Sequence, residues 1–276
     1  MGDRLHDGLL LDMDEAGRMS AGQSEQAAAQ AGGGGRRLSG TWRLVLRSEL
    51  MKVMTLPSLG WTILLTCAAQ AAVMLSAFQN ETLGGSFGFG QIVKTWTLVA
   101  QIGFLAAGIL VSSSEHSSGQ GMTTLLVTPG RVRVAAARLV VLTCTGLLVA
   151  TAMTTAGVVA CPAVSAAAWG AGGRTVAWLT AVLLMAAGAG EMVRRTTGAV
   201  TAMAVLIVLG PELADLLGEA ARWLPGSAGQ DWVTAGQPGA GSGAGETSGA
   251  AAGLTALAWT TLAQAGGFLR LTRSDA

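Results

Sequence analysis

Charged residues are scarce in this sequence. Only 12% of its 276 residues are Asp, Glu, Lys or Arg, whereas 51% are apolar, and the mean hydropathy is +0.51. Soluble proteins carry about 25% charged residues, so this chain lacks the charge that would cover the surface of a soluble domain. The apolar content also excludes disorder over the whole length. The net charge of +1 provides no field that would attract nucleic acid.

Cysteine and histidine are also few. Cys67, Cys144 and Cys161 are too scattered for a disulfide framework or a zinc cluster. Two histidines, at positions 6 and 116, are too few for most histidine-based metal or proton chemistry, so no metal site is predicted. An intramembrane enzyme would need polar catalytic groups within apolar stretches. The chain also has no nucleotide-binding motif, so we expect neither enzymatic activity nor a cofactor on it.

Six long apolar stretches are what the chain has instead, and they predict an all-α polytopic membrane protein. A bilayer core about 30 Å thick requires about 20 helical residues. Only helices or closed barrels satisfy the backbone in lipid, and these stretches lack the alternation of barrel strands. The predicted transmembrane helices are 58–78, 91–112, 135–160, 174–191, 196–212 and 250–269.

The beginning of the chain differs from the rest. Residues 1–38 mix charges with Ala, Gln and Ser and contain a glycine run at 32–35, which predicts a flexible cytoplasmic tail before a transmembrane domain at 39–276. If both termini are cytoplasmic, most arginines fall in the inner segments. The basic residues left outside are then Lys94, Arg174 and Arg222. This bias follows the positive-inside rule and agrees with an even number of spans.

An amphipathic segment precedes the first predicted span. Residues 41–56 place Trp42 and several aliphatic residues on one helical stripe, which predicts an interfacial helix at the membrane surface. Glu49 falls on the same stripe, and a carboxylate there needs a partner. Two partners are open: Lys52, three residues on, or an arginine of the second cytoplasmic segment.

A second amphipathic segment lies at residues 211–225, which the topology places outside the cell. Its leucines and alanines share one helical face, its charged residues share the other, and prolines bracket it. We expect one short extracellular amphipathic helix here. At the edge of the fourth span, Glu191 is expected to pair with Arg194 or Arg195.

Polar side chains within the spans allow two interpretations. The glutamines there are Gln70, Gln101 and Gln264. Hydrogen bonding between helices is their simplest role, and Lys94, near the outer end of the second span, is expected to extend toward the surface. A place along a transport pathway is the alternative for Gln70, Lys94 and Gln101.

Four short stretches have an order and spacing that resembles the permease subunits of bacterial type-2 ATP-binding cassette exporters. They are 47–52 before the first span, 115–122 at the end of the second, Pro-Gly-Arg at 129–131 before the third, and the terminal 273–276. The resemblance covers about residues 41–276. It implies a multi-pass exporter subunit in the bacterial cell membrane, paired with a second permease copy or paralogue. It also implies two separate ATPase subunits, which bind the ATP and Mg.

The loop that begins near residue 113 is the largest cytoplasmic loop of the predicted topology. The resemblance implies that it couples the permease to the ATPase, and its apolar residues also favour docking over a solvated turn. The residues expected to serve this coupling are Glu115, Gly119, Met122, Leu125 and Arg131. The alternative function is a membrane scaffold or immunity protein that transports nothing.

Overall fold

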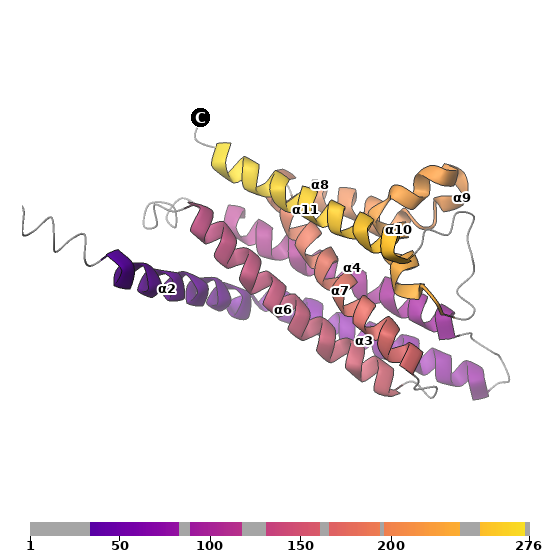
Figure 1. Cartoon of the computed structure of the whole chain (residues 1–276). Coiled ribbons are helices and arrows are strands. Elements are labelled where there is room, and N and C mark those ends of the chain that lie inside the picture. The colour runs from indigo at the N-terminus through magenta and orange to yellow at the C-terminus, as the bar shows by residue number, and fades with distance from the viewer. Residues whose placement is uncertain are drawn as a thin grey trace, which may run out of the picture. The chain divides into compact units, whose positions relative to one another are not determined.

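The structure is a computed structural model, and it describes residues 34–82, 89–117, 131–160, 166–193, 196–237 and 249–273 (Figure 1). These residues are almost entirely helical, and they include no strand. Residues 1–48 and 49–276 form two compact units, and the sections below concern the second unless they say otherwise. The predicted all-α class is therefore confirmed for the described residues.

The helices follow one another along the chain as six long and five short elements among the described residues. The long ones are α2 (Gly34–Thr55), α3 (Pro57–Thr82), α4 (Phe89–Ser117), α6 (Arg131–Ala160), α7 (Ala166–Val193) and α11 (Gly249–Arg273). The short ones are α8 (Thr196–Met203), the π-helix η1 (Ala204–Leu209), α9 (Ala214–Leu217), the 3₁₀ helix η2 (Gly218–Trp223) and α10 (Pro225–Thr234). Helix α2 begins within the predicted tail, the rest of which lies outside the described residues.

Four helices are long and apolar enough to cross a membrane. Their apolar segments are Pro57–Gln79, Gly90–Ser113, Val132–Ala160 and Ala168–Val193, on α3, α4, α6 and α7. They coincide with the first four predicted spans. This indicates a membrane protein, as the scarcity of charge predicts.

The fifth and sixth predicted spans remain predictions. Helices α8 and η1 together form an apolar helix over Thr196–Leu209, which at 1.5 Å per residue reaches about 21 Å, short of a bilayer core of about 30 Å. Helix α11 has 25 residues, enough in length, but it is less apolar than the four helices above.

The structure corrects the prediction of one amphipathic helix at 211–225. Residues 214–217 form the single turn α9, and the 3₁₀ helix η2 follows it. Gly218 joins the two with φ of +55°, a conformation that ends an α-helix. The periodicity of apolar residues in the sequence does not reveal such a break. Helix α10, which begins at Pro225 and is largely buried, was not predicted.

Small residues pack helix α7 tightly against its neighbours. A β-carbon added at Gly108 of α4 would lie 2.4 Å from the carbonyl oxygen of Leu183 on α7. One added at Gly188 of α7 would lie 2.5 Å from the carbonyl oxygen of Ala263 on α11. Backbone therefore meets backbone along two seams, as small residues allow in membrane helices, and α7 forms the centre of the bundle (Figure 1).

Side-chain hydrogen bonds also join α7 to its neighbours. The indole Nε1 of Trp178 donates to Oε1 of Gln101 on α4 at 3.0 Å. The amide Nε2 of Gln264 on α11 donates to the carbonyl oxygen of Leu184 at 2.6 Å. These two glutamines thus make the interhelical bonds that the packing interpretation expects.

Candidate functional site

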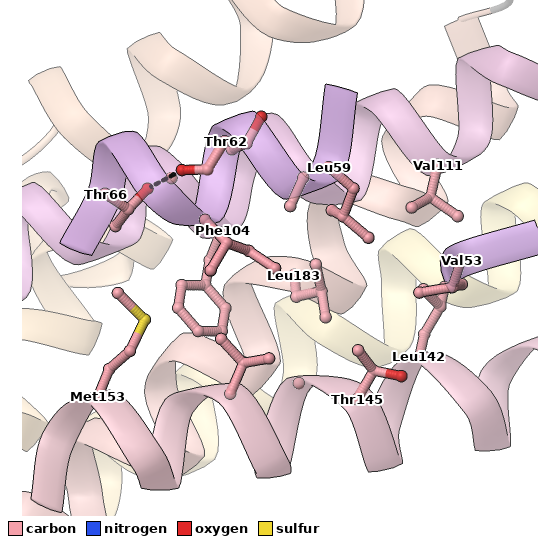
Figure 2. A pocket seen from close by; sticks show the side chains of 15 residues that line it. Val53, Leu59, Thr62, Thr66, Phe104, Val111, Leu142, Thr145, Met153 and Leu183 are labelled. Atoms are coloured by element: carbon pink, nitrogen blue, oxygen red, sulfur yellow. Dashed lines mark hydrogen bonds between the residues drawn. The ribbon is translucent and has the colours of Figure 1, made fainter. Parts of the chain in front are cut away.

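Helix α3 packs less closely than α7 and leaves a cavity beside it (Figure 2). The cavity is partly open to the outside, and α3, α4 and α6 form most of its wall. Its apolar lining includes Leu59 and Thr66 of α3, Phe104 and Val111 of α4, and Leu142 and Met153 of α6. We call this the first cavity.

A second cavity follows along the same helices. Its lining includes Met74 of α3, Trp96 of α4, Thr154 of α6 and Thr175 of α7. Like the first, it is partly open and mainly apolar.

The two cavities lie in register. On α3 the first cavity reaches Thr66, and the second contacts Met74, two turns further on. On α6 the first cavity ends at Met153 and the second begins at Thr154. The two cavities thus follow one another along α3 and α6, and we call them together the α3–α6 crevice.

Two buried polar atoms without hydrogen-bond partners lie on the helices that flank the cavities. One is the hydroxyl of Thr154 on α6, a residue that lines the second cavity. The other is the amide Nε2 of Gln70 on α3, a residue that lines neither cavity. By contrast, the Thr66 hydroxyl donates to the carbonyl oxygen of Thr62 at 2.7 Å.

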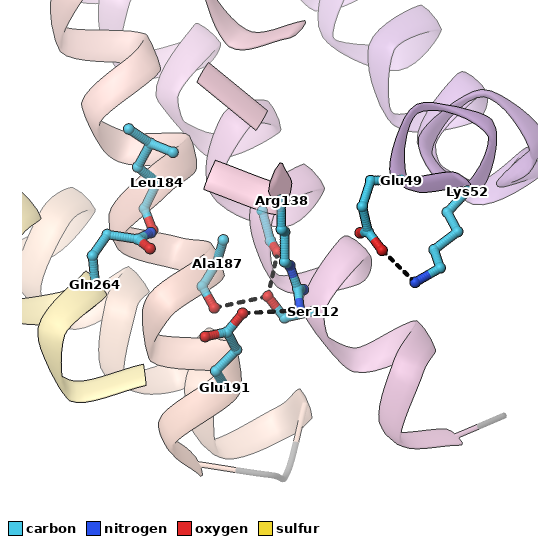
Figure 3. A network of polar contacts seen from close by, with 9 residues as sticks. Glu49, Lys52, Ser112, Arg138, Leu184, Ala187, Glu191 and Gln264 are labelled. Carbon is cyan, nitrogen blue, oxygen red and sulfur yellow. Dashed lines mark hydrogen bonds and ion pairs between the residues drawn. The ribbon is translucent and has the colours of Figure 1, made fainter. Parts of the chain in front are cut away.

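Charged side chains gather at one end of the bundle, where α4 ends at Ser117 and α6 begins at Arg131 (Figure 3). We call it the 117/131 end. Nη1 of Arg138 on α6 lies 2.9 Å from Oε1 of Glu191 on α7, and these side chains are 11% and 19% exposed. This ion pair joins α6 to α7 in a largely buried setting.

Glu191 has a partner that the sequence analysis did not expect, Arg138 on α6. Arg194 and Arg195, the expected partners, lie outside the described residues, so that pairing stays a prediction. Close to this ion pair, the Ser112 hydroxyl of α4 donates to the carbonyl oxygen of Ala187 on α7 at 2.7 Å. Helix α7 is thus joined to both α4 and α6 at the 117/131 end (Figure 3).

Of the two partners considered for Glu49, the structure shows Lys52, three residues further along the same helix. Nζ of Lys52 lies 2.6 Å from Oε1 of Glu49, within helix α2 (Figure 3). Glu49 is 4% exposed, so its position on the apolar stripe is indeed buried. Trp42 also lies on α2, in the first unit.

The residues expected to couple to the ATPase are mostly beyond what the structure describes. Helix α4 includes Glu115 and helix α6 begins at Arg131, but their side chains lie outside the described part. Gly119, Met122 and Leu125 lie outside it altogether. Their role stays a prediction.

The three candidate pathway residues lie apart. Lys94 is exposed near the start of α4, in agreement with an extended side chain. Gln101 is fully buried and bonded to Trp178, whereas Gln70 is buried on α3 and its amide Nε2 has no hydrogen-bond partner. Thr154 was missed, because nothing in the sequence distinguishes it from the threonines that donate to their own helix.

Comparison with protein families and curated proteins assigns no function to these features. No family model matches the chain, and no curated protein matches it. Among the described residues, no group of three His, Cys, Asp or Glu side chains could hold a metal ion. The crevice and the charged 117/131 end are therefore the features on which a functional proposal must rest.

Proposed function

We propose that this chain is the transmembrane permease subunit of an ATP-binding cassette exporter and forms the substrate pathway. The α3–α6 crevice is the observation that carries the proposal, because it extends along three apolar helices past both Thr66 and Met74. A passive scaffold needs no such crevice. The absence of a nucleotide-binding motif fits a division of labour in which ATP and Mg bind to a partner subunit.

The topology of the proposal has six spans in the bacterial cell membrane. Helices α8 and η1 make the fifth span together with the residues that follow, and α11 makes the sixth. Both termini and the 117/131 end face the cytoplasm, as the distribution of arginine favours. A second permease copy or paralogue completes the pathway.

The packing of the helices suggests how ATP hydrolysis on the partner subunit would change the crevice. Helices α4 and α6 carry the segment 118–130 between them, so an ATPase docked there acts on both walls of the crevice. Helix α7 is held to α4 by Ser112 and to α6 by Arg138. Small shear movements of packed helices then change the width of the crevice and leave the α7 seams intact.

The test is the double variant Met122→Asp with Leu125→Asp, co-expressed with the candidate ATPase subunit. Two charges on the docking surface should abolish co-purification and transport, because desolvated charges without partners are costly, while membrane insertion is unchanged. The matched control is Leu213→Asp with Leu216→Asp, since both leucines are exposed and lie between η1 and η2. Co-purification and transport at the unmodified level in the Met122 and Leu125 variant would contradict the proposal, as would activity without any ATPase subunit.

A further inference from the structure

We propose that the 3₁₀ helix η2 docks against η2 of a second copy of this chain, within the depth of the membrane. The Glu219 carboxylate of each copy then pairs with the Arg222 guanidinium of the other. The inference rests on the proposed function, which expects a second permease copy or paralogue, and it names that partner and the surface that it contacts.

The helix that leaves the 117/131 end stops partway across the membrane. Helix α8 begins at Thr196, three residues after α7 ends at Val193, and a β-carbon added at Gly198 would lie 3.1 Å from Cγ1 of Val193. Ile207 follows Thr196 by 11 residues, so it lies about 16 Å from that end. Helix α10 begins at the same depth, because a β-carbon added at Gly226 would lie 2.2 Å from the carbonyl oxygen of Ile207.

Helix α10 completes the crossing. A β-carbon added at Gly229 would lie 2.2 Å from the ring of Trp178, and Nη2 of Arg174 donates to the carbonyl oxygen of Ala235 at 2.7 Å. Trp178 and Arg174 precede the end of α7 by 15 and 19 residues, about 22 and 28 Å. Helices α8, η1 and α10 thus cross a bilayer core of about 30 Å as one broken span. Residues 210–224 leave the bundle and return to it between the two halves.

A hydrogen bond from α11 holds η2 at mid-depth. The indole Nε1 of Trp259 donates to the carbonyl oxygen of Trp223, the last residue of η2, at 2.8 Å. Trp259 precedes Gly267 by 8 residues, about 12 Å. A β-carbon added at Gly267 would lie 2.6 Å from Oε2 of Glu191, near the end of α7. The end of η2 is therefore about 15 Å from the 117/131 end, in agreement with the depth of Ile207.

The surface of η2 does not suit lipid at this depth. Glu219 is 88% exposed and Arg222 is 40% exposed within one chain, and their closest nitrogen and oxygen atoms are 3.8 Å apart. Trp223, 61% exposed, lies beside them, with its ring centroid 5.5 Å from Cζ of Arg222. Charged side chains inside a membrane are costly and almost always face protein or a water-filled cavity. We therefore expect protein to cover this surface.

The surface is complementary to itself. In a two-fold interface the same patch of both copies meets, so each charge needs an opposite charge on its own patch. Helix η2 has one carboxylate and one guanidinium three residues apart, and a two-fold rotation can pair Glu219 with Arg222 twice. Arginine and tryptophan are also enriched at protein interfaces. A second copy meets these conditions without any further charged group.

Disulfide cross-linking between two tagged copies of the full chain tests the contact. Cys67, Cys144 and Cys161 are replaced by alanine, one copy carries Glu219→Cys, the other carries Arg222→Cys, and both are oxidised in the same membranes. We expect a covalent product that carries both tags. The matched control is Leu254→Cys with Leu257→Cys on α11, which are also three residues apart and are 68% and 53% exposed. This control pair should give no product above background.

Charge reversal tests the pairing. Glu219→Arg should raise the dissociation constant of the two copies at least about tenfold, because like charges then meet twice across the interface. The double variant Glu219→Arg with Arg222→Glu should restore the unmodified value. Both side chains are exposed within one chain, so the fold of the single chain should remain unchanged. Energy transfer between labelled copies in vesicles, measured over a range of protein-to-lipid ratios, gives the constant.

Two results would overturn the inference. The first is a cross-linked product no greater for the η2 pair than for the α11 pair. Labelling of the Glu219→Cys variant by a lipid-chain diazirine or a water-soluble maleimide would then assign the surface to lipid or to water. The second is an unmodified dissociation constant in Glu219→Arg.

Neither assay requires the ATPase, so failure here can be separated from failure of the proposed function. Association through η2 without co-purification of any ATPase would reject the permease assignment and leave the surface standing. Co-purification and transport without association through η2 would do the opposite.

Discussion

Helices α7 and α3 are both long and apolar, yet they occupy opposite situations in the bundle. In the most apolar stretch of α7, 61% of residues are buried, against 11% in α3. Helix α7 is rich in glycine and alanine on several faces, which lets three neighbours approach its backbone. Helix α3 presents large side chains such as Trp61 and Leu65 outward. Small residues, rather than apolarity, therefore decide which helix becomes the centre.

The same difference in packing separates a rigid part of the bundle, around α7, from an adaptable part, beside α3. Backbone contacts at Gly108 and Gly188 leave no space for rearrangement, because close-packed interiors transmit strain. The α3–α6 crevice contains unfilled volume, and the hydroxyl of Thr154 in its lining has no partner. Three substitutions test whether this contrast holds, and they are ordered by the size of the expected effect.

The largest effect is expected at the seam between α4 and α7. Gly108→Leu should lower the free energy of unfolding by at least about 3 kcal/mol, because the new side chain meets the backbone of Leu183. Gly173→Leu is the control, since a β-carbon there meets nothing within 4 Å. Unfolding in mixed detergent micelles measures both. Similar losses in the two variants would mean that the seam is no tighter than the surface of α7.

An intermediate effect is expected at the ion pair between α6 and α7. Glu191→Gln should lower the free energy of unfolding by about 2 kcal/mol, because the Arg138 guanidinium is largely buried and loses its carboxylate. Glu219→Gln breaks the exposed pair with Arg222 and should change stability by less than about 0.5 kcal/mol. A double-mutant cycle with Arg138→Gln measures the coupling, and a coupling energy near zero would contradict the buried pair.

The smallest effect is expected in the crevice. Val149→Leu adds one methylene to the first cavity, where space exists, and should stabilise the chain by up to about 0.8 kcal/mol. The same change in a filled core costs about 1–3 kcal/mol. The measurement is again unfolding in micelles, with Val182→Leu on α7 as the fully buried comparison. A loss at Val149 as large as at Val182 would show that the crevice is filled by the protein itself.

Local patterns explain the predictions that agree with the structure. The first four spans follow from apolar length, and the partner of Glu49 follows from a spacing of three residues within one helix. The sequence analysis missed the break at Gly218, because helical periodicity describes the spacing of side chains and does not reveal a positive φ. The sequence analysis also missed Arg138 as a partner of Glu191, because Arg138 lies on another helix.

The sequence by itself determined that this is an all-helical, apolar protein, since scarce charge and apolar runs of about 20 residues allow few other structures. It also determined which helix can lie at the centre, through the small residues of α7. Only the tertiary structure decided that Thr154 lines a cavity with its hydroxyl unpaired and that the side chain of Gln101 accepts a hydrogen bond from Trp178. Each of these outcomes depends on the register between helices, which arises from packing among distant residues and has no signature within a single helix.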